Sequence, residues 1–281
     1  MSWHPHPDWS FPGKLYRFGD ADNGQTVLLT HGTFSNIDTL TPLAASLDAQ
    51  GLRVFGIEWR ERGGRPGGFT YDDIADLEIS EAIKTIAGPQ GLHLIGHSGG
   101  GLALILGLHL NPDLRPMIQS LICLATQATH LHQASWRFRT GLRLMRVFGR
   151  LTGYWTVRVS RLGPCNESAA LQSQWLDWNH AGRMTDLSGN DVFAGLKDWK
   201  LPVMAVAAPL DTDIAPTDGC QTLAKAFGKT GQFHIATRET DGEDFTHSRL
   251  IRSRAAARVL WPRIAEFIQI QDKPKPRSEQ P

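Results

Sequence analysis

Strand-like and helix-like hydrophobic patterns alternate along most of this chain. Short apolar runs typical of buried strands lie at 14–18, 26–30, 52–59, 92–95, 117–125, 202–208 and 232–238. Helical patterns separate them, at 40–50, at 72–87, from about 101 onward, at 217–227 and at 249–270. Such alternation predicts an α/β fold with a doubly wound, mostly parallel sheet that carries helices on both faces. In sheets of this kind the active site lies at the carboxyl ends of the strands.

One long segment interrupts the alternation. Residues 127–198 carry no strand pattern, yet they are too long and too aromatic for a plain loop. We expect an inserted helical cap here, on an α/β core formed by 1–126 and 199–270. The Pro- and charge-rich tail at 271–281 is expected to be disordered.

Composition and charge narrow the class of protein. The chain has 281 residues, of which 41% are hydrophobic, enough for one large core. Its formal net charge of +1 gives no argument for a nucleic-acid partner, and we expect none. No run is long enough to span a bilayer and no secretory leader pattern opens the chain, so a cytoplasmic protein is expected.

Cysteine and histidine spacing gives no sign of a metal site. Cys123, Cys165 and Cys220 are far apart, and their odd number fits a reducing compartment. His4 and His6 have no nearby partners at metal-ligand spacing. We expect neither a metal nor a cofactor, and no oligomeric state is predicted.

Residues 96–100 read Gly-His-Ser-Gly-Gly, a G-x-S-x-G pattern between a strand-like run and a helix-like run. A serine at the tip of so tight a turn is pushed into a strained backbone region, and only very small side chains fit two residues away, as Gly96 and Gly100 do. The turn exposes the Ser98 hydroxyl and aims the N–H of Gly99 toward a forming oxyanion. The pattern predicts a nucleophile, and an ordinary Gly/Ser turn is the alternative.

A second turn directly follows the strand at 26–30 and reads His31-Gly32-Thr33-Phe34. Gly32 lets the chain turn sharply, so that the N–H of Thr33, or alternatively that of Phe34, can point at the same oxyanion as Gly99. A simple strand-ending turn is the other interpretation.

An acid and a base are expected at the next strand ends. Asp211 lies three residues past the strand at 202–208, with enough loop to reach a histidine, whereas Asp213 lies nearer the following helix and can cap it. We favour Asp211 and keep Asp213 as the alternative acid. Of the eleven histidines, only His234 and His247 follow these aspartates. His234 falls inside a strand pattern, so His247, in the loop before the last helix, is the predicted base.

Taken in the order Ser, Asp, His, these motifs resemble the α/β-hydrolase fold serine hydrolases of the esterase and lipase kind, over nearly the whole chain. The resemblance implies that His247 removes the proton of Ser98, which attacks an acyl carbonyl, and that Asp211 orients His247. The amides of Thr33 and Gly99 would hold the oxyanion.

The chain departs from the family pattern at two places. Ala208 stands where the family usually has Gly three residues before the acid, which keeps Asp213 open, and Thr246 stands where Gly often precedes the histidine. His97 adjoins the nucleophile, but the elbow points successive side chains apart, so a structural role is expected for it.

The expected substrate is a small or medium carboxylic ester with an apolar acyl or alcohol part, cleaved without a cofactor. An acyltransferase, or a hydrolase of carbon-carbon, lactone or amide bonds, would use the same triad, because the reaction depends on pocket shape and water access. A catalytically silent binding protein on the same fold is the alternative from another class.

The segment expected to form the cap is basic. No Asp or Glu occurs between Leu114 and Asn166, while arginines cluster at 137, 139, 143, 146, 150, 158 and 161. Those at 139, 143, 146 and 150 have helical spacing and predict one arginine stripe, with Met145, Phe148 and Leu151 offset around the helix. Attraction to anionic lipid or to an acidic substrate is one interpretation, and a solvated face is the other. We expect no stable membrane insertion and allow weak surface contact through the stripe.

Two further features lie near the predicted site. Trp136, Trp155, Trp175 and Trp178 suggest an aromatic roof over the site, or packing between cap and core. The Gly- and Arg-rich loop at 60–68 lacks the signature of a phosphate cradle and is expected to be solvated at the site entrance.

Overall fold

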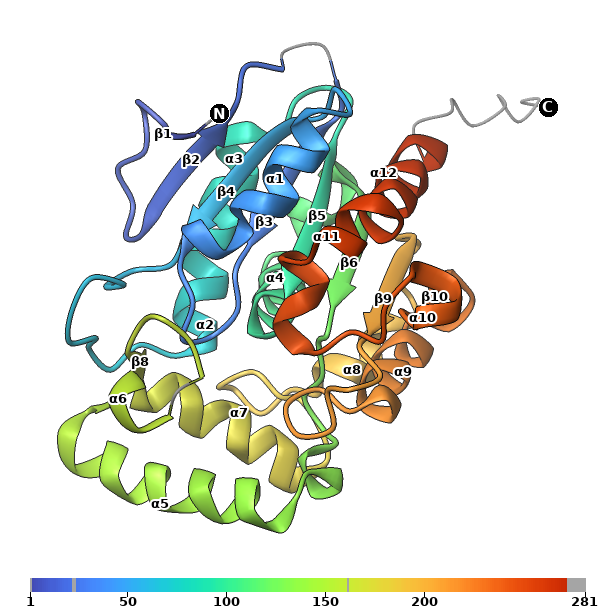
Figure 1. Ribbon diagram of the computed structural model, residues 1–281. Coiled ribbons are helices and arrows are strands. Elements are labelled where there is room, and N and C mark those ends of the chain that lie inside the picture. Colours follow the sequence, from blue (N-terminus) through green and yellow to red (C-terminus); the bar gives the residue numbers. More distant parts are fainter. Residues whose placement is uncertain (1, 22–23, 161, 272–281) are drawn as a thin grey trace.

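An eight-stranded β-sheet organises the protein (Figure 1). The computed structural model describes residues 2–21, 24–160 and 162–271. Its strand order is β1-β2-β4-β3-β5-β6-β9-β10. The strands are β1 (Trp3–Pro5), β2 (Lys14–Phe18), β3 (Thr26–Thr30), β4 (Arg53–Glu58), β5 (Leu92–His97), β6 (Ile118–Leu124), β9 (Val203–Ala207) and β10 (Gly231–Ile235). β2 pairs antiparallel with β1 and β4, and every pair from β4 to β10 is parallel, which confirms the predicted α/β fold.

The central strands are apolar because helices cover both faces of the sheet. Every residue of β3, β5 and β9 is buried, as continuous apolar runs in parallel sheets require. One face packs against α1 (Thr41–Asp48), α11 (Arg254–Arg258) and α12 (Leu260–Gln271). The other packs against α3 (Ser80–Ile86), α4 (Gly99–Leu110) and α9 (Thr217–Ala226).

The observed elements differ from the predicted ones mainly in how the helical segments are divided. The pattern at 72–87 forms one continuous helical segment: α2 (Tyr71–Asp73), a π-helix (Ile74–Ile79) and α3. The single closing helix expected at 249–270 is wrong, because the chain there forms a 3-10 helix (His247–Ile251), then α11, then α12. Strand β1 and the short helix α10 (Arg238–Asp241) were not expected.

The break in the closing helix has a local cause. Ser253 has extended backbone angles, and its side chain accepts a hydrogen bond from the N–H of Ala256, so a new helix begins there. Val259 departs from helical angles and ends α11. Pro262 is tolerated in the first turn of α12, where a missing N–H costs no helical hydrogen bond.

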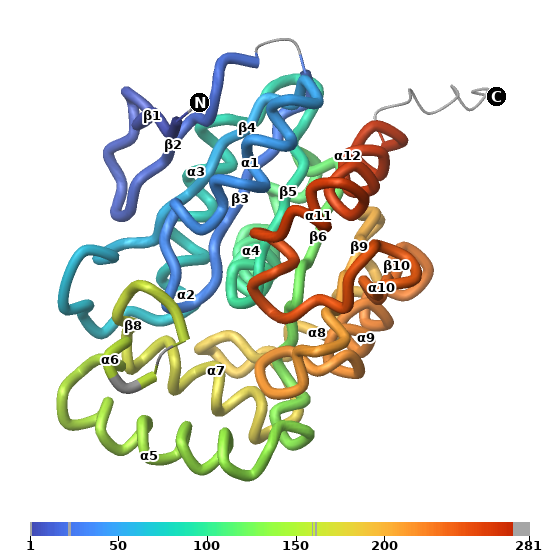
Figure 2. Tube along the Cα trace, viewed as in Figure 1, coloured from blue at the N-terminus to red at the C-terminus, as the bar shows by residue number. Residues whose placement is uncertain are grey.

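Residues 127–198, here called the insertion, join β6 to β9 and are mainly helical. They form a 3-10 helix (Leu131–Gln133), α5 (Trp136–Thr152), α6 (Val157–Ser160), α7 (Ala169–Ala181) and α8 (Val192–Leu196). A short antiparallel pair, β7 (Tyr154–Trp155) with β8 (Glu167–Ser168), was not expected. Figures 1 and 2 show α5, α6 and α7 together beyond the carboxyl ends of the strands.

Two predictions concern the C-terminal tail and membrane-spanning segments. The tail predicted to be disordered, 271–281, lies outside the described residues apart from Gln271, which ends α12. No helix within the described part of the chain combines the length and the apolar character needed to cross a membrane.

A buried ion pair between Arg62 and Glu167 fastens the insertion to the core. The loop at 60–68 was expected to be solvated, and most of its residues are exposed. Arg62 is an exception, because only 4% of its side chain and 0% of the Glu167 side chain is exposed. The guanidinium donates from Nη1 to Oε2 at 2.8 Å and from Nη2 to Oε1 at 3.0 Å. It also lies 5.2 Å from the ring centre of Trp59. The two parallel charge-assisted hydrogen bonds, together with the packing of the guanidinium over the Trp59 ring, hold the loop and β8 against each other.

This pair predicts the stability of matched variants. Glu167→Gln leaves the Arg62 charge buried without its partner, so the free energy of unfolding should fall by about 3 to 5 kcal/mol. The control is Asp177→Asn, which breaks an ion pair of similar length in the same insertion, with Arg146 at 2.7 Å, where 59% of the Asp177 side chain is exposed. The control should lose less than about 1 kcal/mol. Urea denaturation measures both, and equal losses would contradict a dominant role for the buried pair.

Candidate active site

Ser98 occupies a strained turn between β5 and α4. Its backbone angles are φ 54° and ψ −125°, in the region that disfavours side chains. A Cβ on Gly96 would stand 2.4 Å from the nitrogen of Gly101. A Cβ on Gly100 would stand 2.6 Å from the carbonyl oxygens of Thr30 and His31, so both positions require glycine.

The turn after β3 packs directly against this elbow. A Cβ on Gly32 would stand 2.9 Å from the Cβ of Ser98. His31 accepts the N–H of Trp59 at its Nε2 (3.2 Å), so its Nδ1 carries the proton and donates to the Gly32 oxygen (2.8 Å). Burial, helped by the nearby charge of Arg62, holds the pKa of His31 well below its usual value, which keeps the ring neutral.

The hydrogen bond from His31 orients the next peptide. In a trans peptide the C=O and the N–H point in opposite directions, so the N–H of Thr33 points away from the His31 ring. The Thr33 nitrogen lies 3.4 Å from where a Cβ on Gly99 would stand. The main chains of Thr33 and Gly99 therefore lie side by side.

Phe34, the alternative donor, is committed elsewhere. Its N–H donates to Oε2 of Glu167 at 2.9 Å, and its φ of 59° turns the chain toward the insertion. The same carboxylate binds Arg62, so one buried group serves both the loop and the turn. Sequence reasoning missed Glu167, because its partners are more than 100 residues away in the chain.

The loops after β9 and β10 bring Asp211 and His247 together. His247 Nδ1 donates to Oδ2 of Asp211, while Oδ1 of Asp211 accepts the N–H of Ile214 at 3.1 Å. Burial works to raise the pKa of the Asp211 carboxyl, but the neighbouring His247 and the backbone donors outweigh it, so this pKa lies below its usual value. The two loops are also joined by the N–H of Leu210, which donates to the Phe245 oxygen at 3.0 Å.

Asp213 and His234 lie apart from this pair. Asp213 Oδ1 accepts the N–H of Ser135 at 2.7 Å, just before α5, so it holds the start of an insertion helix. His234 Nε2 pairs with Oδ2 of Asp241 at 2.6 Å. Neither residue contributes to the wall around Ser98 and His247.

His97 supports the backbone of His247. Its Nε2 donates to the His247 carbonyl oxygen at 3.0 Å, and the two ring centres are 4.7 Å apart. Its Nδ1 is buried without a hydrogen-bond partner. Burial, together with the nearby His247, lowers the pKa of His97 to about 3, so the ring is neutral at ordinary pH.

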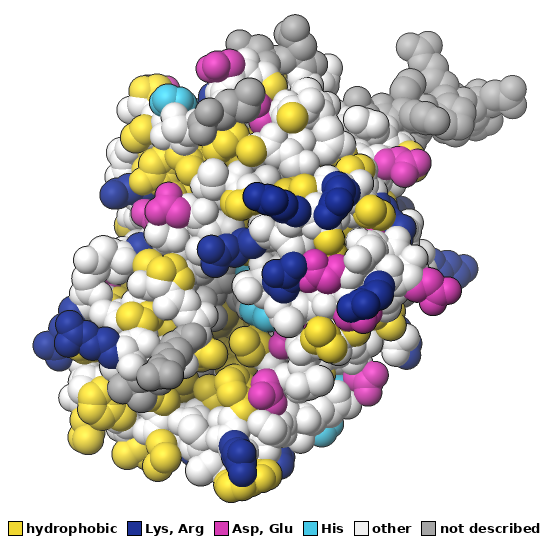
Figure 3. Space-filling view, viewed as in Figure 1, with side chains coloured by type: hydrophobic (Ala, Val, Ile, Leu, Met, Phe, Trp, Pro, Cys, Tyr) yellow, Lys and Arg dark blue, Asp and Glu magenta, His cyan; other side chains and the backbone are white. Residues whose placement is uncertain are grey.

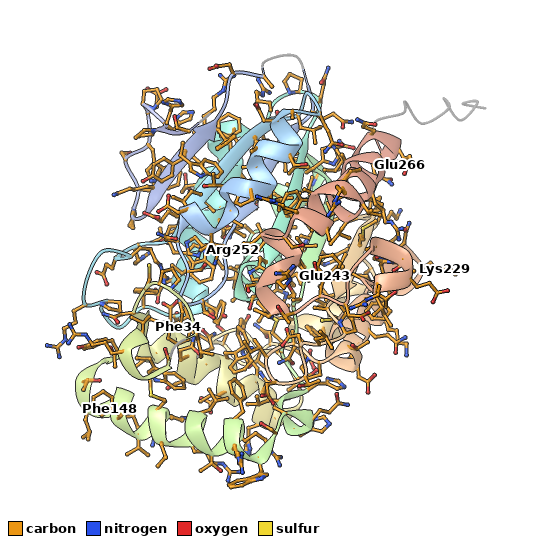
Figure 4. All side chains as sticks on the ribbon, viewed as in Figure 1. Phe34, Phe148, Lys229, Glu243, Arg252 and Glu266 are labelled. Carbon is orange, nitrogen blue, oxygen red and sulfur yellow. The ribbon has the colours of Figure 1, made fainter. Side chains whose placement is uncertain are left out.

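A pocket of about 230 Å³ joins these groups to the insertion. Thr33, Ser98, Gly99 and His247 lie in its wall, and the insertion adds Phe138, Leu142, Leu162 and Trp175. Figure 3 shows a hollow with hydrophobic side chains between the insertion and the rest of the molecule. Phe34 and Arg252, labelled in Figure 4, also line the pocket, from the turn after β3 and from the segment before α11.

The tryptophans divide between the two alternatives that the sequence left open, a roof over the site and packing between cap and core. Of the four tryptophans, Trp175 lines the pocket, whereas Trp155 and Trp178 are buried in the core and Trp136 is exposed. Tyr71 was missed by sequence reasoning. Its hydroxyl lies 2.4 Å from where a Cβ on Gly99 would stand, and burial raises its pKa well above the usual value, so it remains a neutral donor.

Solved structures with the same fold include known lipases and esterases. A monoacylglycerol lipase from Paleococcus ferrophilus superposes with a TM-score of 0.64 at 18% identity, covering 96% of this chain and 100% of its own. A thermophilic esterase from Thermogutta terrifontis gives 0.62 at 17%, covering 97% and 100%. A lipase-esterase related protein from Clostridium acetobutylicum gives 0.58 at 16%, covering 91% and 98%. At these identities the likeness establishes the fold alone.

The sequence itself identifies the family. No curated protein matches it. The model of the alpha/beta hydrolase family, however, matches residues 27–264, which include the elbow, the turn after β3 and both loops of the Asp211–His247 pair. With most of its length matched and an eight-stranded sheet of the same architecture, this chain belongs to the alpha/beta hydrolase family.

Proposed function

We propose that this protein is a serine hydrolase that cleaves a carboxylic ester through an acyl-enzyme on Ser98. The observation that carries the proposal is the meeting of Ser98, the Asp211–His247 pair and the amides of Thr33 and Gly99 at one pocket. Ser98 and Gly99 follow β5, Thr33 follows β3, Asp211 follows β9 and His247 follows β10, so four strand ends supply the nucleophile, base, acid and oxyanion donors that acyl transfer by a serine uses.

The chemistry follows from the protonation states. Because Nδ1 of His247 donates to Asp211, its Nε2 is free to accept the proton of Ser98 as the hydroxyl attacks the acyl carbonyl. Asp211 stays ionised and stabilises the imidazolium. His247 then protonates the leaving alcohol, and it activates the water that hydrolyses the acyl-enzyme.

The amides of Thr33 and Gly99 hold the oxyanion in this proposal. We favour Thr33 over Phe34, because the N–H of Phe34 is already bonded to Glu167. Each donor of such a pair contributes on the order of 3 kcal/mol to transition-state stabilisation. The Tyr71 hydroxyl, beside Gly99 in the pocket wall, is positioned to donate to a second oxygen of the substrate.

The pocket supports a small or medium ester with an apolar part. Its volume of about 230 Å³ is modest, and the insertion lines one side with Phe138, Leu142 and Trp175. These side chains stabilise an acyl or alcohol group by burying apolar surface.

A fluorophosphonate probe tests the nucleophile. The folded protein should be labelled on Ser98, as located by mass spectrometry of the peptides, and Ser98→Ala should lose both labelling and hydrolysis of a nitrophenyl ester. A probe adduct on any other residue, or a folded protein that resists labelling, would sink the proposal.

The choice of acid is tested by two matched amides. Asp211→Asn removes the charge that orients His247, so kcat should fall by about 10⁴-fold. Asp213→Asn keeps an acceptor for the N–H of Ser135 and should change kcat less than about three-fold. Steady-state kinetics on a nitrophenyl ester measure both, and a loss confined to the Asp213 variant would make our assignment wrong.

The neutral state of His97 predicts a pH dependence of stability. Its pKa is about 3 in the folded protein, against 6.5 for an ordinary histidine, so between these values the unfolded chain alone binds a proton. The stability contributed by neutral His97 is therefore complete above this window. It falls with decreasing pH, by at most about 1.4 kcal/mol per pH unit.

The variant His97→Asn isolates this effect, because Asn keeps a donor for the His247 oxygen but does not titrate. The difference in unfolding free energy between the parent protein and this variant should shift in favour of the variant as pH falls from about 6.5 to 4. Urea denaturation at several pH values measures it. A difference independent of pH would mean that His97 is protonated as readily when folded as when unfolded.

A further inference from the structure

Helix α5 has three chemically distinct faces. Leu142, Met145 and Gly149 are buried against the rest of the protein. At about 100° per residue, its exposed apolar side chains fall within an arc of about 120° on another side. These are Trp136, Leu144, Val147, Phe148 and Leu151. The arginine stripe occupies a separate arc of about 60° between the two.

The exposed apolar face is unusual for a protein surface. Five of the twelve large hydrophobic side chains that the described residues leave exposed are on this one helix, and Leu151 is 83% exposed. Phe148, labelled in Figure 4, lies on α5 at the edge of the molecule away from the sheet. Single exposed apolar residues are ordinary, but a contiguous group marks a surface that another phase or molecule covers.

Positive charge borders this face. Arg143 and Arg150 are exposed along one side of it, whereas Arg137, exposed next to Trp136, falls within the apolar arc itself. Among the described residues, one acidic side chain forms an ion pair with the arginine stripe. It is Asp177, which pairs with Arg146. An apolar arc edged by arginines, with a tryptophan at one end, is complementary to the boundary between acyl chains and anionic headgroups.

An apolar groove links this face to the active site. The groove has a volume of about 460 Å³ and is lined by Leu144, Met145 and Phe148 together with Phe138, Leu142 and Leu162. The last three also line the pocket that holds Ser98. The exposed side of α5 and the proposed catalytic pocket therefore share a continuous apolar wall.

We propose that α5 docks the protein on the surface of an anionic lipid bilayer. Trp136, Leu144, Val147, Phe148 and Leu151 enter the boundary of the acyl chains, and Arg143 and Arg150 contact the headgroup phosphates. The groove then opens toward the lipid. Docking does not depend on the proposed hydrolysis, because it uses none of the residues at Ser98.

Flotation with vesicles tests this proposal, using phosphatidylcholine alone and phosphatidylcholine mixed with phosphatidylglycerol. The protein should bind the mixed vesicles more tightly. Arg143→Gln with Arg150→Gln should weaken binding to the mixed vesicles by about five-fold per arginine and reduce the preference for them. Val147→Ser with Leu151→Ser should weaken binding to both kinds of vesicle by more than about ten-fold.

Matched controls change similar residues away from α5. Lys225→Gln with Lys229→Gln removes two exposed charges, and Ile270→Ser removes an exposed apolar side chain, so both should bind as the parent protein does. The circular dichroism spectrum should be unchanged in every variant, which shows that each is folded, and activity on a soluble nitrophenyl ester should also be unchanged. An inactive parent that still binds vesicles would refute the proposed hydrolysis and leave docking intact.

Three outcomes would overturn the docking proposal. The first is a parent protein that does not bind the anionic vesicles. The second is α5 variants that bind as well as the controls do. The third is a parent protein that is dimeric by light scattering and becomes monomeric in Val147→Ser with Leu151→Ser, because the apolar face would then be covered by a second copy of the chain.

Discussion

The strained conformation of Ser98 is the constraint around which the site is built. Holding a non-glycine residue at φ 54° costs on the order of 1 to 3 kcal/mol, so the neighbouring chain must hold it in place. The N–H of Ser98 donates to the Leu124 oxygen at 2.8 Å, and its carbonyl accepts from the Thr126 hydroxyl at 3.0 Å. The elbow also packs closely against the end of β3 and the turn after it, where Gly32 lies against Ser98 and the carbonyl oxygens of Thr30 and His31 lie against Gly100.

One buried carboxylate of the insertion contacts both the loop at 60–68 and the turn after β3. Glu167 binds the guanidinium of Arg62 and also the N–H of Phe34, so the position of β8 and the shape of the turn after β3 are coupled. A change in the insertion that moves Glu167 would therefore also move Phe34 and, one residue before it, the amide of Thr33. The same segment supplies the apolar wall of the pocket and the exposed face of α5. In the proposed function and the proposed docking, substrate selection and contact with lipid depend on the insertion more than on the elbow.

The features predicted from the sequence are those that depend on residues close together in the chain. The strand at 26–30 was predicted to the residue, because a run buried on both faces has a distinctive composition. The positions of Ser98, Asp211 and His247 follow from strand ends. Which aspartate contacts His247 depends on the fold, because Asp213 accepts the N–H of Ser135 in a distant segment whereas Asp211 pairs with His247. Glu167, the burial of Arg62 and the place of Tyr71 beside Gly99 depend on packing between distant segments, which leaves no periodic signal in the sequence.

The most direct test of the account is a crystal structure of the protein phosphonylated on Ser98. The phosphoryl oxygen should accept hydrogen bonds of about 2.7 to 3.1 Å from the N–H groups of Thr33 and Gly99, while the N–H of Phe34 stays bonded to Glu167. Two results would contradict the proposed mechanism, in which the amides of Thr33 and Gly99 hold the oxyanion. One is a phosphoryl oxygen directed away from these two amides. The other is a Phe34 N–H that leaves Glu167 and binds the phosphoryl oxygen.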